Sequence, residues 1–216
     1  SSVGDLGRAI PLFEQALGDC RRVLGDDHPG TLASVNNLAS AYSSVGDLGR
    51  AIPLFEQALG DCRRVLGDDH PGTLTSVNNL ASAYESVGDL GRAIPLFEQA
   101  LGDRRRVLGD DHPDTLTSVN NLAGAYSSVG DLGRAIPLFE QALSDRRRVL
   151  GDDHPDTLTS VNNLAGAYES VGDLGRAIPL YEQALADCRR VLGDDHPQTR
   201  VIYGNLRAVM EGISSE

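Results

Sequence analysis

The chain has 216 residues and a formal net charge of −12, because 31 acidic residues outnumber 19 basic ones. A surface of this sign disfavours nucleic acids and anionic membranes as partners, since both attract clustered positive charge. No apolar run approaches the roughly 18 residues that cross a membrane, and no signal peptide is visible, so we expect a cytoplasmic protein.

The sequence repeats itself every 42 residues, almost letter for letter, so that residues 1–42 and 43–84 differ only at Ala33 and Thr75. A period of this length predicts a solenoid, in which each unit buries its apolar face against its neighbours. We expect one all-α solenoid over residues 1–216, a superhelix of stacked antiparallel helix pairs. Its expected parts are an orphan helix in 1–29, four helix pairs in 30–71, 72–113, 114–155 and 156–197, and a capping helix with a tail in 198–216.

The first expected element is a single helix at about residues 5–24. Its apolar residues Leu6, Ile10, Phe13 and Leu17 recur at threes and fours, which is typical of an amphipathic helix. No helix precedes it in the sequence, so we expect this apolar face to be partly open and available for self-association.

Each repeat then begins with a first helix, here called helix A, which the second full repeat places at about residues 72–86. Val77, Leu80, Ala81 and Tyr84 stand at i, i+3, i+4 and i+7 and form one apolar stripe. The small Ala81 should let the second helix of the repeat approach closely.

The second helix of the same repeat, helix B, is expected at about residues 89–108. Asp89 is a good N-cap, and Gly109 suits the position after the last turn. Pro113 suits the first position of the following helix A. Pro95 lies inside helix B, where it removes one backbone hydrogen bond, so we expect a bend there without a break.

The last element is expected at about residues 198–213 as a degenerate helix A. Arg200 and Arg207 replace the leucine and the alanine that the earlier helices carry at these places, Leu158 and Ala165. Charges on a face that would otherwise pack are typical of the solvating terminal repeats that such arrays require.

Two adjacent asparagines in the middle of helix A are the most distinctive polar feature, because asparagine is a mediocre helix former. They lie off the apolar stripe. An asparagine amide both donates and accepts, so it can bind a peptide backbone of any sequence. The alternative is that one asparagine bonds across neighbouring helices and the pairs are structural. The candidate binding residues are Asn36, Asn37, Asn78, Asn79, Asn120, Asn121, Asn162, Asn163, Thr75, Thr117, Thr159 and Ser82.

One position late in helix B is cysteine in three repeats and arginine in two. The residues are Cys20, Cys62, Arg104, Arg146 and Cys188. A position that accepts either residue type is expected to be exposed. Stacked helices lie roughly 8–10 Å apart, beyond the about 7 Å between Cα atoms that a disulfide allows. We therefore expect free thiols in a reducing compartment, and we interpret the arginine runs as a solvated face.

The recurrent Gly-Asp-Asp-His-Pro segment contains metal-ligand residue types, but each copy offers a single histidine, and a zinc site needs four convergent ligands. We interpret the segment as a turn. One near-identical unit cannot supply the distinct nucleophile, base and orienting group of a catalytic site. We therefore expect neither an enzyme nor a bound metal or cofactor.

The run Leu80-Ala81-Tyr84, Gly88-Asp89, Ala93, Phe97 and Ala100 resembles the tetratricopeptide repeat (TPR) pattern. The 42-residue period resembles the kinesin-light-chain type of TPR, and also bacterial arrays attached to signalling NTPases. The use of arginine without lysine favours a GC-rich, bacterial genome. The resemblance implies a right-handed superhelix whose A helices line a concave groove, and protein or peptide binding as a class.

TPR domains that bind a C-terminal carboxylate use Arg or Lys residues on their A helices. Here these positions carry Thr75, Asn78 and Asn79, and Glu85 lies nearby. An extended segment with some basic character is therefore the expected ligand. The leading hypothesis is an interaction scaffold that binds peptides in this groove. The alternatives are a structural solenoid that joins head to tail, and the sensor arm of a larger signalling NTPase.

Overall fold

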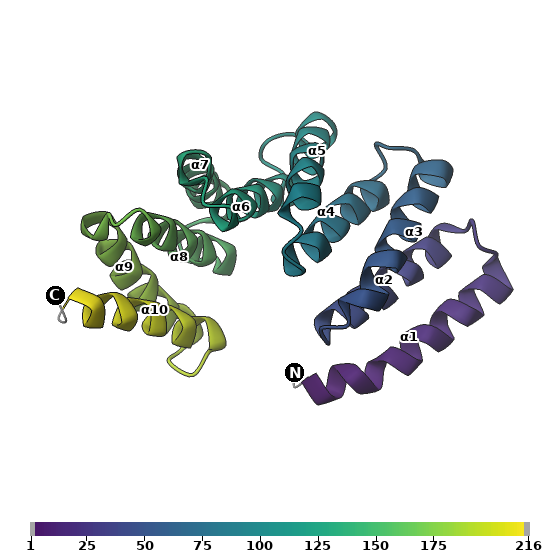
Figure 1. The fold of residues 1–216 in the computed structure, drawn as a ribbon, viewed down its shortest axis with the longest axis horizontal. Coiled ribbons are helices and arrows are strands. Elements are labelled where there is room, and N and C mark those ends of the chain that lie inside the picture. The colour runs from purple at the N-terminus through teal and green to yellow at the C-terminus, as the bar shows by residue number, and fades with distance from the viewer. Residues whose placement is uncertain (1–2, 214–216) are drawn as a thin grey trace. The chain divides into compact units, whose positions relative to one another are not determined.

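The structure of the protein is a computed structural model, which describes the backbone of residues 3–213 and the side chains of residues 9–212 (Figure 1). Helices are the only regular elements in this part of the chain, which confirms the all-α prediction. The helices are α1 (Val3–Leu24), α2 (Pro29–Ser44), α3 (Leu48–Leu66), α4 (Pro71–Ser86), α5 (Leu90–Leu108), α6 (Pro113–Ser128), α7 (Leu132–Leu150), α8 (Pro155–Ser170), α9 (Leu174–Leu192) and α10 (Pro197–Ile213).

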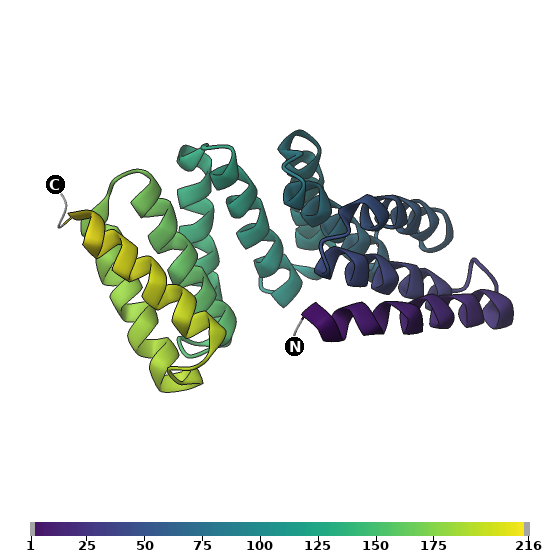
Figure 2. The ribbon, with the colours of Figure 1, turned by 60° about the horizontal axis from the view of Figure 1, so that its bottom comes forward.

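The chain divides into two compact units, residues 1–107 and residues 108–216. In unit 1, α2 packs against both α1 and α3, and α3 packs against α4. In unit 2, α7 packs against α6 and α8, while α9 packs against α8 and α10; Figure 2 shows these last three helices side by side in green and yellow. Even-numbered helices are therefore the predicted A helices, and odd-numbered helices are the B helices.

Each A helix begins at the proline that the sequence predicts, with a histidine as its N-cap. In α4, His70 is extended, and its Nδ1 accepts a hydrogen bond of 3.0 Å from the backbone N–H of Gly72. Pro71 follows at the first helical position, where a missing N–H costs nothing. The Gly-Asp-Asp-His-Pro segment is thus a helix-start signal, as the turn interpretation requires.

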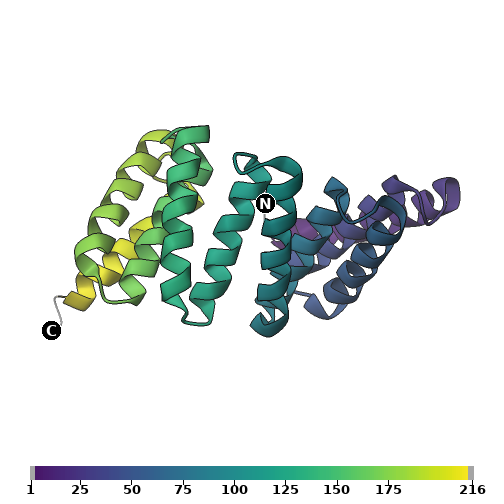
Figure 3. The same cartoon turned by 90° about the horizontal axis from the view of Figure 1, so that it is seen from above.

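The B helices begin and end at a second set of local signals. The carboxylate of Asp47 caps α3 by accepting from the backbone N–H of Arg50 at 3.2 Å. Gly67 ends the helix with φ of 86°, which side-chain-bearing residues rarely adopt. The helix is continuous through Pro53, as predicted. The antiparallel arrangement of A and B helices is visible from above in Figure 3.

Small and large residues alternate in the core, as the sequence predicts. Ala81 and Ala93 are completely buried, and Leu74, Val77 and Phe97 fill the space around them. Because alanine adds little bulk, it leaves room at these buried positions for the larger side chains.

The side chains of α1 and α10 are less completely buried than those of the helices between them. In α1, Leu17 is buried, whereas Ile10 and Phe13 are only half-buried, as predicted; the side chain of Leu6 lies outside the described residues. In α10, Arg200 and Arg207 are exposed. Within the described part of the chain, no helix is long and apolar enough to cross a membrane.

Candidate functional site

A shallow hollow of about 190 Å³ opens on the A-helix face of unit 1, between α2 and α4. Asn79 and Ser82, both candidate residues, belong to its wall. The side chain of Asn79 is half-buried, and no described residue forms a hydrogen bond with it. Its two donors and its acceptor are therefore unused. The hollow is lined by Ser40, Ser43, Ser44, Phe55, Asn79, Ser82, Ala83 and Ser86.

The A-helix face of unit 2 has a larger hollow, of about 610 Å³. Gly124 and Gly166 line it, at the places where unit 1 carries Ser40 and Ser82, so fewer side-chain atoms fill the space. The lining residues are Gly124, Ser127, Phe139, Asn162, Asn163, Gly166, Ala167, Glu169, Ser170, Tyr181 and Asn205.

In unit 2 the asparagines bond across neighbouring A helices. The Nδ2 group of Asn163 donates to Oδ1 of Asn120 at 3.1 Å, and Asn205 donates to Asn162 at the same distance. These bonds, which we call asparagine rungs, are what the structural interpretation of the asparagine pairs requires. They also hold Asn162 and Asn163 in fixed orientations at the hollow.

In unit 1 the corresponding rung is absent from the described side chains. Asn36 instead donates to Oγ of Ser76 at 2.7 Å, and its own Oδ1 is buried without a partner. Asn79, which would complete the rung, keeps its amide unpaired. The two units therefore present the same asparagines in two states, one mutually bonded and one unengaged.

One of the two rungs lies beside a buried arginine, whereas the rung between α8 and α10 lies beside Cys188, with Ile202 in place of the serine. Arg146 of α7 is only 4% exposed and donates from Nη1 to Ser160 Oγ at 2.8 Å and to the Asp156 carbonyl at 3.0 Å. In unit 1 the equivalent residue is Cys62, whose sulfur lies 3.6 Å from the Ser76 hydroxyl that donates to it. Ser160 is thus engaged by the guanidinium, whereas Ser76 accepts from an asparagine.

The prediction that the cysteine and arginine positions are exposed is therefore wrong. Cys62, Cys188, Arg104 and Arg146 are all buried. The thiols are free. Burial lowers the pKa of the Arg146 guanidinium, and the nearby carboxylate of Asp156 opposes that shift. Arginine is accepted at a buried site because it finds hydrogen-bond acceptors and a carboxylate there, not because it reaches water.

The remaining candidate residues lie outside these two hollows. Asn37 and Thr75 are exposed, and Asn78 and Asn121 are half-buried. The threonines stand near the start of their helices, where their hydroxyls donate to carbonyls of the same helix, Thr117 to Pro113 at 2.9 Å and Thr159 to Pro155 at 3.0 Å. The hollows thus bring together asparagine and serine, and not the predicted threonines.

A tyrosine and two glutamates also shape the A-helix face. Tyr181 is 2% exposed and donates from its hydroxyl to Oε2 of Glu169 at 2.7 Å. Burial raises the pKa of the equivalent carboxyl in unit 1, Glu85, which faces a repeat that has Phe97 in place of the tyrosine. The single change from phenylalanine to tyrosine at this repeat position was the sequence signal for this pair.

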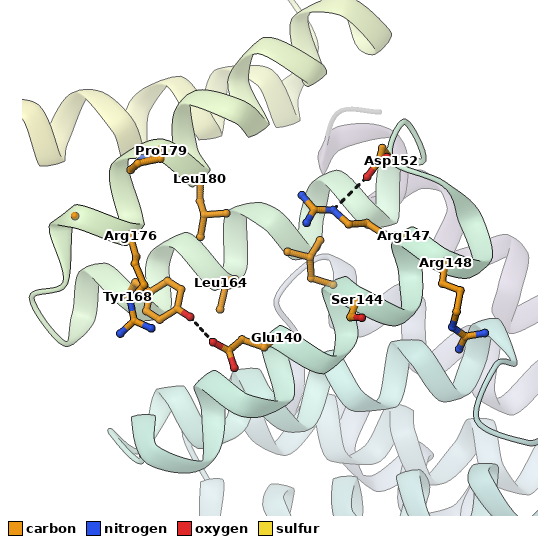
Figure 4. A pocket seen from close by; sticks show the side chains of 12 residues that line it. Glu140, Ser144, Arg147, Arg148, Asp152, Leu164, Tyr168, Arg176, Pro179 and Leu180 are labelled. Carbon is orange, nitrogen blue, oxygen red and sulfur yellow. Dashed lines mark hydrogen bonds and ion pairs between the residues drawn. The ribbon is translucent and has the colours of Figure 1, made fainter.

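A different pocket, of about 830 Å³, lies between the B helices α7 and α9 above α8 (Figure 4). Tyr168 donates a hydrogen bond to Glu140 on one side of it, and the Arg176 guanidinium lies 4.0 Å from the centroid of the tyrosine ring. None of the candidate residues lines this pocket. Its lining is Glu140, Leu143, Ser144, Arg147, Arg148, Asp152, Leu164, Tyr168, Gly175, Arg176, Pro179 and Leu180.

Ion pairs connect each inter-repeat loop to the next B helix. Arg64 contacts Asp27 at 2.6 Å and Asp61 at 3.1 Å, and the other repeats copy the arrangement. The guanidinium holds the pKa of Asp27 below its ordinary range. We call the inter-repeat pairs the loop ladder: Asp27–Arg64, Asp69–Arg106, Asp111–Arg148 and Asp153–Arg190. The solvated-face interpretation is right for these exposed arginines.

Among the described residues, no group of three or more His, Cys, Asp or Glu side chains is placed to hold a metal ion. A family model described as tetratricopeptide repeat matches residues 2–60, 45–102, 90–147, 120–188 and 161–210. No curated protein matches the chain.

The solved structures that are similar to this chain include the following two. One is a putative kinesin light chain of Podosopora anserina with nearly identical TPR-like repeats, with 34% identity over 87% of this chain and 88% of that chain, and a TM-score of 0.74. The other is BtubC (BKLC) from P. vanneervenii, with 25% identity over 97% of this chain and 84% of that chain, and a TM-score of 0.81.

Proposed function

The chain belongs to the tetratricopeptide repeat family, whose members generally mediate protein–protein interactions, and we propose that it binds extended peptide segments along its A-helix face. The observation that carries the proposal is the unengaged amide of Asn79 in the wall of the unit 1 hollow. A half-buried amide with free donors and a free acceptor can bond a peptide backbone without reading its side chains.

The composition of the hollows supports the same proposal. Serine hydroxyls surround Asn79 in unit 1, and Glu169 lines the unit 2 hollow. Hydroxyls and amides bind backbone groups, and a carboxylate attracts a basic side chain. A peptide with some basic character therefore fits this face better than an acidic one, in agreement with the net charge of −12.

The test begins with a display library of random dodecapeptides, from which the wild-type chain selects binders. Each selected peptide is titrated by fluorescence anisotropy against wild type, Asn79→Ala, and the triple variant Asn79→Ala, Asn121→Ala, Asn163→Ala. Loss of one backbone hydrogen bond costs about 0.5–1.5 kcal/mol. We expect binding weakened about threefold by the single change and more than tenfold by the triple change.

Two controls make the result specific. Asn79 has no hydrogen-bond partner among the described residues, so the Asn79→Ala variant should melt at the wild-type temperature. Gln57→Ala and Gln183→Ala remove exposed amides from B helices and should leave binding unchanged. Selected peptides that bind the triple variant as tightly as wild type would refute the A-helix face as the site.

Self-association through α1 is a second candidate function, favoured by the exposure of one alanine. Ala16 of α1 is exposed, whereas the equivalent alanines inside the array, Ala58, Ala142 and Ala184, are completely buried. In the internal B helices this residue is covered by neighbouring helices that α1 lacks among the described residues. An apolar face of this kind favours contact with another protein surface.

Light-scattering mass across a concentration series, with reductant present, tests this candidate. We expect the mass to climb above 23 kDa with concentration. The Ala16→Arg variant should stay at that mass, because it places a charge on the open face. Gly18→Arg is the matched control, since Gly18 has no neighbour within 4 Å and its equivalents are exposed in every B helix. A wild-type mass that never rises would exclude self-association.

A further inference from the structure

We infer that the unit 2 hollow receives an arginine side chain of the bound peptide, with Glu169 as the group that recognises it. The inference rests on the proposed function, because the peptide must lie along the A-helix face to reach the hollow, and it adds which residue of the peptide is read. Glu169 is the only charged residue among the described residues that line this hollow, and it is half-buried. A half-buried carboxylate without a counter-ion favours a ligand that carries a cation.

The carboxylate of Glu169 is held in place and keeps one oxygen available. Tyr181, which is 2% exposed, donates from its hydroxyl to Oε2 of Glu169 at 2.7 Å. Burial and this bond raise the pKa of the tyrosine, so its hydroxyl keeps the proton at neutral pH and acts as a donor. No described residue donates to Oε1 of Glu169. The second oxygen can therefore accept a hydrogen bond from a ligand.

The asparagine rungs add neutral acceptors to the same hollow. Asn163 and Asn205 both line it, and each donates from Nδ2 to the neighbouring A helix. The carbonyl oxygen of each of these two amides has no donor among the described residues. A guanidinium has five N–H donors and no acceptor, whereas an ammonium has three donors. Several separate acceptors around one carboxylate therefore suit arginine better than lysine.

Two glycines make room for the incoming side chain. Gly124 and Gly166 stand where unit 1 carries serines, and the hollow has about 610 Å³ against about 190 Å³ in unit 1. A Cβ atom at Gly166 would lie 3.3 Å from the hydroxyl oxygen of Tyr181, which is closer than an ordinary van der Waals contact. Glycine at this position thus accommodates both the tyrosine hydroxyl and a ligand side chain.

Unit 1 provides an internal comparison, because its hollow differs in each of these features. No charged residue lines it, and Glu85, the equivalent of Glu169, lies outside its wall. Phe97 takes the place of the tyrosine, so the hydroxyl donor is missing. Ser82 takes the place of the glycine. We therefore expect arginine recognition in unit 2 and not in unit 1.

The experiment uses a fluorescein-labelled dodecapeptide of alternating alanine and serine with one arginine near its centre. Three further probes carry lysine, citrulline or glutamate at that place; citrulline has the shape of arginine without its charge. Fluorescence anisotropy measures binding to the full chain. We expect the arginine probe to bind about threefold more tightly than the lysine probe and more than about tenfold more tightly than the citrulline probe, as is typical of a charge-assisted hydrogen bond.

Two glutamine substitutions separate the pocket from the general negative charge of the chain. Glu169→Gln keeps an acceptor and removes the charge, and it should weaken binding of the arginine probe about tenfold while changing citrulline binding less than about twofold. Glu85→Gln is the matched control, because it makes the same change in net charge outside the hollow. It should leave the affinities for both probes unchanged.

Tyr181 is a positioning residue in this scheme, and its role has a readout of its own. Tyr181→Phe should lower the ratio of arginine to citrulline affinity about threefold, whereas a purely structural role would weaken all four probes equally. The double variant Gly166→Ser, Tyr181→Phe copies the combination of Ser82 and Phe97, which unit 1 already accommodates, so it should fold. It should abolish the preference for arginine over citrulline.

The outcomes distinguish this inference from the proposed function. Equal binding of the arginine and citrulline probes refutes the arginine pocket, and so does a preference that Glu169→Gln and Glu85→Gln reduce equally. A wild-type chain that binds none of the four probes, but does bind dodecapeptides selected from the display library, refutes the arginine pocket alone. Selected dodecapeptides that bind the triple asparagine variant as tightly as wild type refute the proposed function, and with it the peptide route to the hollow.

Discussion

Arg146 donates to the hydroxyl of Ser160 at 2.8 Å, at a junction where the asparagines of α6 and α8 bond to each other. Where the hydroxyl is held by the guanidinium, Asn120 accepts from Asn163 and a rung forms. Beside Cys62, the hydroxyl of Ser76 accepts from Asn36 and no rung forms there; beside Cys188, where Ile202 takes the place of the serine, Asn205 donates to Asn162. At the described junctions, a rung therefore forms where no serine hydroxyl accepts from the asparagine.

Converting one junction between repeats into the other should need two changes. Cys62→Arg alone places a guanidinium in a buried site beside Gly72, without a carboxylate, and should destabilise the chain by about 3 kcal/mol. Adding Gly72→Asp supplies the residue that accompanies buried arginine as Asp156, and should recover at least about 1 kcal/mol of that loss. Denaturant unfolding of the two single variants and the double variant measures the coupling.

Gly72→Asp by itself serves as the reference in that cycle. Its backbone N–H should still donate a hydrogen bond to His70, as the backbone N–H of Asp156 donates to Nδ1 of His154 at 3.2 Å. Strict additivity of the two changes would mean that the carboxylate does not stabilise the buried arginine.

Glu85 should make stability depend on pH with a definite sign. Burial raises the pKa of its carboxyl, so the folded chain holds the proton more tightly than the unfolded chain does. Stability from this group is present at low pH and is lost as pH rises through the folded pKa. Glu85→Gln should therefore raise the melting temperature at pH 7, by on the order of 1–2 °C.

The same variant provides its own control at low pH. Near pH 4, wild-type Glu85 is largely protonated and resembles glutamine, so the two melting curves should converge. A difference between the curves that is constant from pH 4 to pH 7 would show that ionisation of Glu85 is not the cause.

A single added hydroxyl should reduce the cost of ionising the buried carboxyl of Glu85. Tyr181 donates to Glu169, and Phe97 stands at the matching place for Glu85. Phe97→Tyr should build the same bond, stabilise the ionised carboxylate and lower its pKa, which carboxyl NMR titration would detect. The reverse change, Tyr181→Phe, should cost about 0.5–1.5 kcal/mol in unfolding free energy. An unmoved Glu85 titration in the Phe97→Tyr variant would contradict the equivalence of the two sites.

The buried position of Ala93 in α5 should be intolerant of bulk. Ala93 is completely buried, so Ala93→Leu should overpack the helix contact and cost roughly 1–3 kcal/mol in denaturant unfolding. Val107→Leu, on the partly exposed surface of the same helix, adds apolar volume without that constraint. Equal stabilities of the two variants would show that Ala93 does not set the helix spacing.

The helices were predictable because their signals are local: Pro71, Asp47 and Gly67 act within a few residues of where they stand. The burial of Arg146 was not predictable from such local signals, because its hydrogen-bond acceptors belong to the next helix. The sequence did hold one clue, since repeats with the buried arginine carry Asp114 or Asp156 where others carry glycine or glutamine.

The asparagine rungs could not be predicted from the sequence for a related reason. Helical periodicity places Asn79 off the core stripe, but it does not specify which group the amide meets. That depends on the Ser76 hydroxyl and, behind it, on Cys62. The spacing of residues in the sequence does not predict such a series of side-chain contacts between helices.

Near-identical units create a hazard during folding, because a B helix can dock on the wrong A helix with almost the right contacts. The buried cysteine and arginine junctions reduce this hazard. An arginine-type B helix that docks on a glycine-type A helix buries its guanidinium without a carboxylate, and the mispaired intermediate is less stable. The buried residue thus distinguishes arginine-type junctions, such as that of Arg146, from cysteine-type junctions, such as that of Cys62, and disfavours pairing between the two types.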